Sequence, residues 1–493
     1  MLPLRNFTLA CACLAATTFS SVALQAQNAK NLEAVFQRIN TEINTHAEGY
    51  EQLQKATSTI GHRLSGTENG AKAEQFVYDL LKSYGLSNVH FESFQMKTWQ
   101  RDTMDLEIVP EDSDNFEPFK AVALAHSPIS ADVSAAIVDV GNGLAVDFEK
   151  VGTKVKGKTA LCNIGLDASA AAGAVNLHRS EKVALAIKSG AIAVIMVNQA
   201  PGDILLTGTA SVTGELIPIP AVCVSANSGK AIRQWMKEEK LIASVQMTNH
   251  FQTVTARNVV ATLKGETREK IVVGGHLDCW DLATGAIDNG IGSFSVLEIA
   301  RTLKALKIKP KRSIEFVFFM GEEQGLHGSE SYVAALHKRP KKLAKIKYMM
   351  NIDMAGNAIG FDAGGRDEAL KFFETTGKLI AATDTAFQNR VSSGAGLHSD
   401  HQAFMLEGIP TASPIANLPR SIYNCYHADC DDFKLVEKKH INNTAKFASM
   451  MLYALANAKD LPASRQTEAE IGAFLTKNKL REKLEIHGQW RWK

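Results

Sequence analysis

The sequence has almost no excess of charge of either sign, with a net charge of +2 over 493 residues. Binding nucleic acid or a membrane surface through charge needs a strong basic or acidic excess, so the composition argues against both roles. The hydrophobic share of 45% and the charged share of 22% are typical of soluble globular proteins. The length predicts two or three domains rather than one.

Beyond the N-terminus, no apolar run is long enough to span a bilayer. The N-terminus itself has a short positive start at Met1–Arg5 and an apolar, small-residue run from Phe7 to about Ala23. This pattern is typical of a secretory signal peptide cleaved after Ala23 or Ala26, with a membrane anchor as the alternative. We therefore expect residues 1–26 to be removed and the mature protein to be secreted or periplasmic, free of the membrane.

Cysteine is scarce, and no two closely spaced cysteine pairs occur, which argues against a structural zinc–thiolate site. The five cysteines outside the signal peptide are Cys162, Cys223, Cys279, Cys425 and Cys430. An odd number leaves at least one thiol free or paired between chains. Cys425 and Cys430 bracket His427 and either form a bridge, which export permits, or stay unpaired.

Several catalytic motifs are also missing. The sequence has no G-x-S-x-G turn between a strand and a helix, and no H-E-x-x-H helix. His398–His401 contains serine-triad residue types, but triad members normally meet through the fold, so this run does not indicate serine catalysis. Gly290–Gly292 resembles half of a dinucleotide-binding loop but lacks the third glycine and the leading strand, so we reject that interpretation.

The hydrophobic patterns divide the chain into regions. Helical spacing runs from about residue 31 to 85, short β-rich runs dominate from about 120 to 250, and strands and helices alternate from Asn258 onward. The alternation predicts an α/β fold, with a mixed, mostly parallel sheet between helix layers and an inserted β-rich domain. The predicted strands are 104–109, 135–140, 159–162, 191–197, 220–224, 270–273, 313–320 and 348–352, and the predicted helices include 182–189 and 292–303.

These patterns give the expected domain boundaries. The expected divisions are 1–26 for the signal peptide, 27–119 for the N-terminal part of the catalytic domain, 120–250 for the insertion and 251–493 for the catalytic part. The charged stretch after about residue 465 is predicted to be a helical tail, whose role the sequence leaves open.

Histidines and carboxylates recur in order along the catalytic part. The set comprises His276, Asp288, Glu322, Glu323, Asp353 and His427. His276, Glu322, Glu323 and Asp353 follow predicted strands, whereas Asp288 lies in a glycine-containing turn and His427 in a polar loop. Each residue alone has a structural alternative, such as a turn aspartate or a solvated loop histidine. Together, two imidazoles and three carboxylates can hold two zinc-like ions and leave one carboxylate as a base, at the sheet edge where α/β folds bind ligands.

Small residues and a further carboxylate accompany His276. Gly274 and Gly275 let the backbone leave the strand and approach a ligand closely. Asp278 is placed to accept the proton of the second imidazole nitrogen and so to fix the tautomer that a metal ligand needs.

The ordered set resembles the M28 family of di-zinc peptidases. The matching stretches are Gly275–Asp278, Ala286–Gly290, Gly321–Ser329, Asn351–Met354, Ser399–His401, Gly408–Pro410, Tyr426–His427 and the N-terminal loop Gly61–Thr67. The inserted segment resembles a protease-associated domain at Lys158–Leu161, Gly190–Ile195 and Ile219–Val222. The run His276–Asp281 is most similar to the carboxypeptidase Q (plasma glutamate carboxypeptidase-like) branch, although Cys279 stands where a small residue such as serine is expected.

The resemblance implies a role for each residue. One metal would take His276 and Asp353, the other would take Glu323 and His427, and Asp288 would bridge both. Glu322 would be the general base that moves a proton from water to the leaving amine. Tyr426 is similar to the family's oxyanion-stabilising tyrosine. Mixed imidazole and carboxylate ligands suit two zinc ions, with manganese or cobalt as substitutes.

The leading functional hypothesis is an exported exopeptidase that hydrolyses unblocked dipeptides or removes terminal residues from small peptides, since members of the carboxypeptidase Q branch do so. A glutamate-carboxypeptidase-like enzyme is the first alternative and needs a cation for the substrate carboxylate, for which Arg420 is the candidate. A receptor of the same architecture is the second, although such proteins typically lose ligands that this chain retains. The sequence leaves open a homodimer and which peptide end is recognised.

Overall fold

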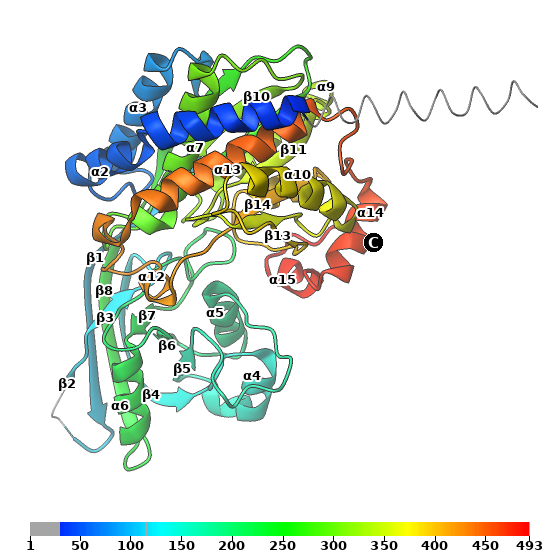
Figure 1. Cartoon of the computed structure of the whole chain (residues 1–493). Coiled ribbons are helices and arrows are strands. Elements are labelled where there is room, and N and C mark those ends of the chain that lie inside the picture. Colours follow the sequence, from blue (N-terminus) through cyan, green and yellow to red (C-terminus); the bar gives the residue numbers. More distant parts are fainter. Residues whose placement is uncertain (1–29, 114–116, 493) are drawn as a thin grey trace, which may run out of the picture.

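The computed structural model describes residues 30–113 and 117–492. They form an upper, helix-rich body and a smaller lower body, joined by strands that run through both (Figure 1). The predicted signal peptide lies outside the described residues. Within them, no helix combines the length and apolar character needed to cross a membrane.

One mixed sheet extends through both bodies. Across the described residues its strand order is β13-β12-β14-β11-β9-β10-β8-β4-β5-β6-β7-β3, with β1 paired to β8 and to β2. The strands are β1 (Ser87–Pro110), β2 (Glu117–Pro118), β3 (Ala121–Ala123), β4 (Ser130–Asp139), β5 (Thr159–Asn163), β6 (Ala193–Val197), β7 (Ala221–Val224), β8 (Leu241–Leu263), β9 (Lys270–His276), β10 (Ser313–Phe319), β11 (Ile346–Asn351), β12 (Gly360–Asp362), β13 (Arg390–Ser392) and β14 (Thr411–Ile415).

Helices cover both faces of this sheet. The longer helices are one over residues 30–46, α2 (Gly49–Thr59), α3 (Glu68–Ser83), α5 (Arg179–Lys188), α6 (Ala226–Trp235), α7 (Ile291–Ala305), α8 (His327–His337), α10 (Leu370–Thr383), α13 (Lys438–Asn457) and α14 (Glu468–Lys477). The shorter ones are α4 (Ala145–Val151), α9 (Pro340–Leu343), α11 (His401–Met405), α12 (Arg420–Tyr423) and α15 (Arg481–Ile486), with 3-10 turns at Gly152–Val155, Asp367–Ala369 and Phe433–Leu435.

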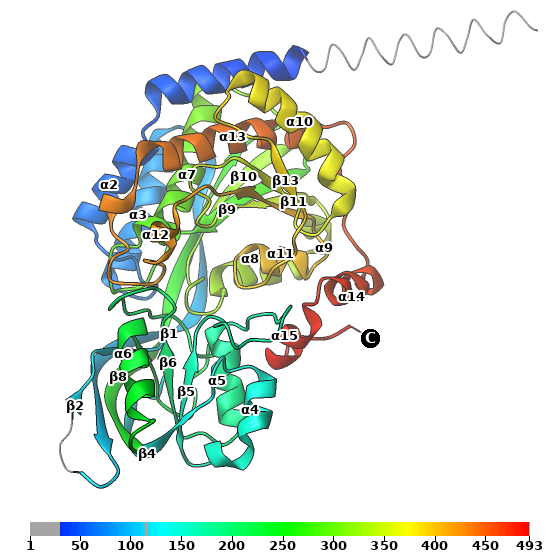
Figure 2. The ribbon, with the colours of Figure 1, turned by 60° about the horizontal axis from the view of Figure 1, so that its bottom comes forward.

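The upper body is built on four parallel strands. β10, β9, β11 and β14 run parallel to their neighbours, while β8 and β12 join them antiparallel. Figure 2 places α7, α10 and α13 on one side of these strands and α8 and α11 on the other. This arrangement confirms the predicted fold class, a mixed and mostly parallel sheet between helix layers.

Strand β9 shows why both faces are covered. Successive side chains of a strand point to opposite faces. Ile271 and Val273 accordingly belong to the apolar core that includes α7 and α13, whereas Val272 belongs to the core that includes α8 and α11. A strand buried on both sides must be continuously apolar, which is the pattern that predicted it.

The lower body repeats this plan on a smaller scale. β4, β5, β6 and β7 are parallel, and β3 closes the edge antiparallel. Leu161 and Ile195 pack with α6 on one face, while Ala160 and Val194 pack with α4 and α5 on the other. The insertion therefore has its own two cores.

The two longest strands connect the bodies. β1 and β8 pair antiparallel along nearly their whole length, from Ser87–Thr262 to Pro110–Leu241. The lower part of this ribbon joins the insertion through β4, and the upper part joins the catalytic sheet through β10. The expected division at residue 250 therefore falls inside β8, and only residues 104–109 of β1 were expected as strand.

The C-terminal segment packs between the bodies. α14 and α15 have a small apolar core of their own, which includes Leu475, Leu484 and Trp492 and reaches Met405 in α11. Figure 2 shows α15 beside α5 of the lower body. The charged tail is thus helical, as predicted, and it contacts both parts of the molecule.

Candidate metal centre

Most of the predicted ligands lie where neighbouring parallel strands end. His276 is the last residue of β9, Glu322 and Glu323 follow β10, and Asp353 follows β11. Because β9 pairs with both β10 and β11, these positions meet at one edge of the sheet.

Asp288 lies between two histidines. It belongs to the buried turn Ala286–Gly290 before α7, and His427 belongs to the loop after α12. Asp288 Oδ1 lies 3.3 Å from His276 Nε2, and Asp288 Oδ2 lies 3.0 Å from His427 Nε2. One carboxylate therefore faces both imidazoles, each through a separate oxygen.

Each histidine also faces a second carboxylate. Asp353 Oδ1 lies 3.4 Å from His276 Nε2. Glu323 Oε2 lies 2.9 Å from His427 Nε2. Glu322 Oε2 is farther away, at 4.0 Å from His276 Nε2, so it borders the cluster rather than completing it. The structure thus brings all five predicted ligands and Glu322 together.

Backbone and hydroxyl groups orient these ligands. His276 Nδ1 lies 3.0 Å from the backbone carbonyl oxygen of Asp278 but 3.8 Å from its carboxylate, so the carbonyl, not the expected carboxylate, accepts the imidazole proton. His427 Nδ1 faces the carbonyl oxygen of Thr207 at 3.3 Å. Ser399 Oγ donates to Asp353 Oδ2 at 2.7 Å. Such contacts leave the Nε2 atoms free to bind metal.

The glycines before His276 serve the neighbouring strands rather than a ligand. A Cβ at Gly274 would lie 2.5 Å from the Val317 carbonyl oxygen of β10, and a Cβ at Gly275 would lie 2.3 Å from the Ile352 carbonyl oxygen. Both distances are well below contact. The two glycines therefore allow the close approach of the strands that carry the other ligands.

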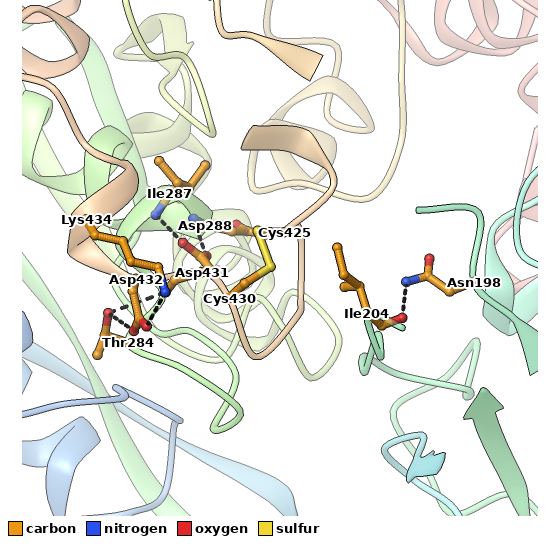
Figure 3. The surroundings of a disulfide bond; sticks show 10 residues. All are labelled: Asn198, Ile204, Thr284, Ile287, Asp288, Cys425, Cys430, Asp431, Asp432 and Lys434. Atoms are coloured by element: carbon orange, nitrogen blue, oxygen red, sulfur yellow. Dashed lines mark hydrogen bonds and ion pairs between the residues drawn. A yellow bond between two sulfur atoms is a disulfide. The ribbon is translucent and has the colours of Figure 1, made fainter. Parts of the chain in front are cut away.

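Asp431 holds the turn that presents Asp288. Its carboxylate accepts the backbone N–H of Ile287 at 2.7 Å and that of Asp288 at 3.0 Å (Figure 3). Asp431 directly follows the disulfide Cys425–Cys430, so the bridge left open by the sequence is present in the structure. The disulfide loop therefore carries His427 and adjoins the residue that fixes Asp288.

Two further residues fasten the loops of the centre, and the sequence alone did not single out either of them. Asn289 donates to the Ile352 carbonyl at 3.0 Å and accepts from the Met354 backbone N–H at 3.0 Å, which ties the Asp288 turn to the Asp353 turn. The fully buried Arg63 donates to the backbone carbonyls of Leu277, Thr284 and Gly285. The matched N-terminal loop thus supports the segment after β9.

The thiol of Cys279 takes no part in the cluster. It is buried and accepts the Arg63 backbone N–H at 3.1 Å. Burial raises the pKa of this thiol to about 12, so it stays protonated at neutral pH. The departure from the family pattern at this position therefore leaves the ligand set unchanged.

Electrostatics distinguish the members of the cluster. Burial raises the pKa of Glu322 well above its usual range, and Glu323 and Asp353 add to the effect while His276 opposes it. Burial also opposes ionisation of Asp288, but the contacts with His276 and His427 outweigh it and lower the pKa. Asp288 is thus held as a carboxylate, whereas Glu322 has the raised affinity for a proton that suits a general base.

The residues present fit a pair of zinc-like ions. Two ligand atoms on one tetrahedral zinc, with bonds of about 2.0–2.2 Å, lie about 3.3–3.6 Å apart. The His276–Asp288 and His276–Asp353 distances of 3.3 and 3.4 Å match this separation, whereas His427 lies closer to Asp288 and Glu323, at 3.0 and 2.9 Å. The buried atoms Glu323 Oε1 and Asp353 Oδ1 have no hydrogen-bond partner, and a cation would satisfy them.

A cavity of about 110 Å³ opens onto the cluster. The lining residues from the lower body are His178, Arg179 and Thr209, and those from the upper body include His276, Asp288, Glu322, Glu323, Asp353, His398, Tyr426 and His427. The site therefore lies at the junction of the two bodies.

Tyr426 and Arg179 lie beside each other in this cavity. The Tyr426 ring stacks on His427 with a centroid distance of 3.8 Å, and its hydroxyl interacts with Arg179. Burial raises the pKa of Tyr426, so the hydroxyl keeps its proton. Arg420, the cation suggested by the sequence, is instead exposed at the start of α12 and does not line the cavity.

Comparison with known proteins agrees with this geometry. Residues 258–452 match peptidase family M28, and residues 128–232 match the PA domain. Carboxypeptidase Q from Mus musculus is 25% identical over 423 residues, which cover 84% of this chain and 86% of that protein.

Solved structures are similar over most of the chain. The crystal structure of a peptidase M28 precursor from Shewanella amazonensis superposes with a TM-score of 0.74 at 22% identity, covering 89% of this chain and all of that one. A zinc aminopeptidase from Bacillus subtilis gives a TM-score of 0.61 at 23% identity, covering 85% of this chain and 97% of that one. Fold, family match and ligand cluster together lead to one conclusion: the chain is a zinc exopeptidase of peptidase family M28 and carries a PA domain.

Proposed function

We propose that this enzyme hydrolyses unblocked dipeptides and that two zinc ions occupy the cluster. His276 and Asp353 would hold one ion, Glu323 and His427 the other, and Asp288 would contact both through its two oxygens. When bound, the ions supply Lewis-acid polarisation of the peptide carbonyl and a lowered pKa for water.

Glu322 supplies the proton transfer in this proposal. Its carboxylate lines the cavity next to the ligands, and its backbone N–H is 3.3 Å from Asp278 Oδ1, which helps to fix the turn. With its raised pKa it accepts a proton from the attacking water and returns it to the nitrogen of the leaving amino acid. The protonated Tyr426 hydroxyl is the donor for the oxyanion that develops on the peptide carbonyl.

The observation that carries the dipeptide proposal is Arg179. Its guanidinium is buried, its Nε has no hydrogen-bond partner, and none of the ion pairs among the described residues involves it. It lines the cavity that the metal ligands share. A buried cation without a carboxylate partner is costly unless a ligand supplies one. The free α-carboxylate of a dipeptide, one residue from the scissile bond, is such a group.

A glycine makes this position of Arg179 possible. A Cβ at Gly208 would lie 2.0 Å from Arg179 Nη2, so any larger residue there would displace the guanidinium. The small cavity also favours a short substrate, because pockets for larger ligands enclose about 300–1,000 Å³.

The glutamate-carboxypeptidase-like alternative needs a second cation for the acidic side chain of its substrate. Arg179 is the only arginine or lysine that lines the cavity among the residues the structure describes. A single guanidinium suffices for the α-carboxylate alone, so the cavity favours dipeptides with uncharged side chains.

Digestion of matched substrates tests the proposal. Free, N-blocked and C-amidated forms of one dipeptide should differ, with rapid hydrolysis of the free form alone. Arg179→Met should raise the KM for the free dipeptide about 10- to 100-fold, as expected for the loss of a hydrogen bond to a charged group. It should leave the kinetics of the C-amidated dipeptide unchanged. Arg420→Met serves as the control and should behave as wild type. Equal effects of Arg179→Met on the free and amidated substrates would reject Arg179 as the carboxylate receptor.

We further propose that the enzyme is exported and acts on peptides outside the cytoplasm. The support is the charged start and apolar run of residues 1–26. N-terminal sequencing of protein from the periplasm or medium should give a start near residue 24 or 27. Exported material that begins at Met1 would contradict cleavage.

A further inference from the structure

Three metal-binding side chains from distant parts of the sequence meet outside the catalytic cluster. Glu181 belongs to α5 in the PA domain, His398 to the loop before α11, and His487 directly follows α15 in the C-terminal segment. One ligand atom from each lies within 4.8 Å of the other two. Figure 2 shows the juxtaposition of α15 and α5 that brings them together.

The distances in this cluster match the separation of two ligand atoms on one metal ion. Glu181 Oε1 lies 3.4 Å from His398 Nε2 and 3.3 Å from His487 Nε2. Hydrogen bonds between charged groups are shorter, at about 2.7–2.9 Å. Atoms that share one tetrahedral zinc lie about 3.3–3.6 Å apart. In the catalytic cluster, His276 Nε2 lies at such distances from Asp288 and from Asp353.

None of the three converging atoms has a hydrogen-bond partner. Glu181 Oε1, His398 Nε2 and His487 Nε2 are all buried and unsatisfied. Leaving a buried polar atom unpaired costs about 1–3 kcal/mol, and more for a charged group. Three such atoms aimed at one point therefore indicate a missing partner that accepts lone pairs.

The side chains are held in this orientation by other contacts. Glu181 Oε2 accepts the backbone N–H of His178 at 2.7 Å, which caps α5 and turns Oε1 toward the histidines. The His398 ring lies between the rings of His178 and His487, with centroid distances of 4.5 and 5.1 Å. The cluster is thus preorganised.

We propose that Glu181, His398 and His487 bind a third zinc-class divalent cation, distinct from the catalytic pair. Two imidazoles and one carboxylate suit zinc, and water would complete a tetrahedral coordination. The ion fastens the PA domain and the C-terminal segment to the catalytic domain at the wall of the substrate cavity, which His398 lines. This assigns a function to the C-terminal helices.

Metal analysis of the zinc-saturated protein tests the site. Wild type should hold three zinc ions per chain, and His487→Gln and His398→Gln should each hold two. His337→Gln is the matched control, because His337 faces Glu407 at the same 3.3 Å but in a surface pair without a third ligand. It should keep three ions. A wild-type count of two, or a count of three in His487→Gln, would overturn the proposal.

Hydrogen–deuterium exchange on the wild-type protein avoids any folding defect of a variant. Adding zinc chloride to metal-free protein should slow exchange at least threefold in two places: the turn 286–290 at the catalytic pair, and residues 481–488 at the third site. If exchange slows at the turn but not at residues 481–488, the third site is wrong and the catalytic pair stands. The reverse result would retain the third site and reject the catalytic assignment.

Discussion

At the residue scale, Glu322 and Asp288 are both carboxylates of the cluster but have different surroundings. Asp288 contacts both histidines, whereas Glu322 lies 4.0 Å from the nearer one. Glu322→Gln should therefore keep both catalytic zinc ions and lower kcat by about 10²- to 10⁴-fold, the usual contribution of a positioned acid–base group. Asp288→Ala should lower zinc occupancy as well as kcat, because it removes the group shared by both ions.

Elemental analysis beside single-turnover kinetics separates these outcomes. Full activity of Glu322→Gln would remove this residue from the role of base. Loss of both ions in the same variant would show that Glu322 is a ligand, and the assignment of Glu323 would then need revision too.

The ligands could be predicted from sequence because each one lies in a short stretch with a family pattern, and His276, Glu323 and Asp353 also follow buried strands. Arg179, Asp431 and Thr207 could not. Arg179 comes from the PA domain, Asp431 acts through backbone N–H groups, and Thr207 contributes only a carbonyl oxygen. None of these roles has a local signal, since each depends on which distant segments the fold brings together.

His126 should make stability depend on pH. It is fully buried in the lower body, and burial lowers its pKa to about 3. The folded state keeps this imidazole neutral while the unfolded state binds a proton below about pH 6.5, so stability falls as pH drops from 6.5 toward 3. At pH 5 the loss from this group is about 2 kcal/mol.

Urea unfolding at pH 7.5 and pH 5.0 measures this effect. Between the two pH values, the free energy of unfolding of His126→Asn should fall by about 2 kcal/mol less than that of wild type. Asn is a suitable replacement because it tolerates the positive φ of this position. The exposed His250→Asn is the control and should match wild type. An unchanged pH dependence in His126→Asn would contradict the neutral state of His126.

At the element scale, the sequence predicted the short buried strands well and the long ribbon poorly. β9, β10 and β11 are short, mostly apolar and almost fully buried, so the apolar runs within them predict their positions. β1 has only stretches of alternation, with a register shift between Arg101 and Met104, and much of it is polar. Its length depends on pairing with β8, a contact between segments more than 130 residues apart that no local pattern records.

The loop closed by Cys425–Cys430 carries His427 and adjoins Asp431. Replacing both cysteines by serine should lower the free energy of unfolding by about 2 kcal/mol. This is the contribution expected when the cross-link of so short a loop no longer restricts the unfolded chain. It should also weaken zinc binding at His427, because the imidazole loses its constraint.

Zinc titration of the double-serine variant, followed by competition with a chelator, measures that loss. A reducing agent should reproduce it in wild type, since the other described cysteines, Cys162, Cys223 and Cys279, are free thiols. Unchanged zinc affinity in both experiments would show that the bridge does not support the centre.

At the scale of the whole molecule, the two bodies share one active site. The PA domain supplies Arg179 to the cavity and the carbonyl of Thr207 to His427, and Leu206 pairs with Ala428 across the junction. Arg101 connects the same region by donating to Asp281 and to Thr207 Oγ1. The PA domain therefore contributes directly to the substrate cavity and to the orientation of the proposed metal ligand His427.

In the proposed mechanism, paired metals at this junction drive hydrolysis of a free dipeptide. The direct measurement is kcat at saturating dipeptide for protein stripped by a chelator, verified metal-free by elemental analysis, and then titrated with zinc. Stripping should abolish turnover, and zinc should restore it as the sites at His276 and His427 are filled. Unchanged turnover in verified metal-free protein would rule out metal-driven hydrolysis.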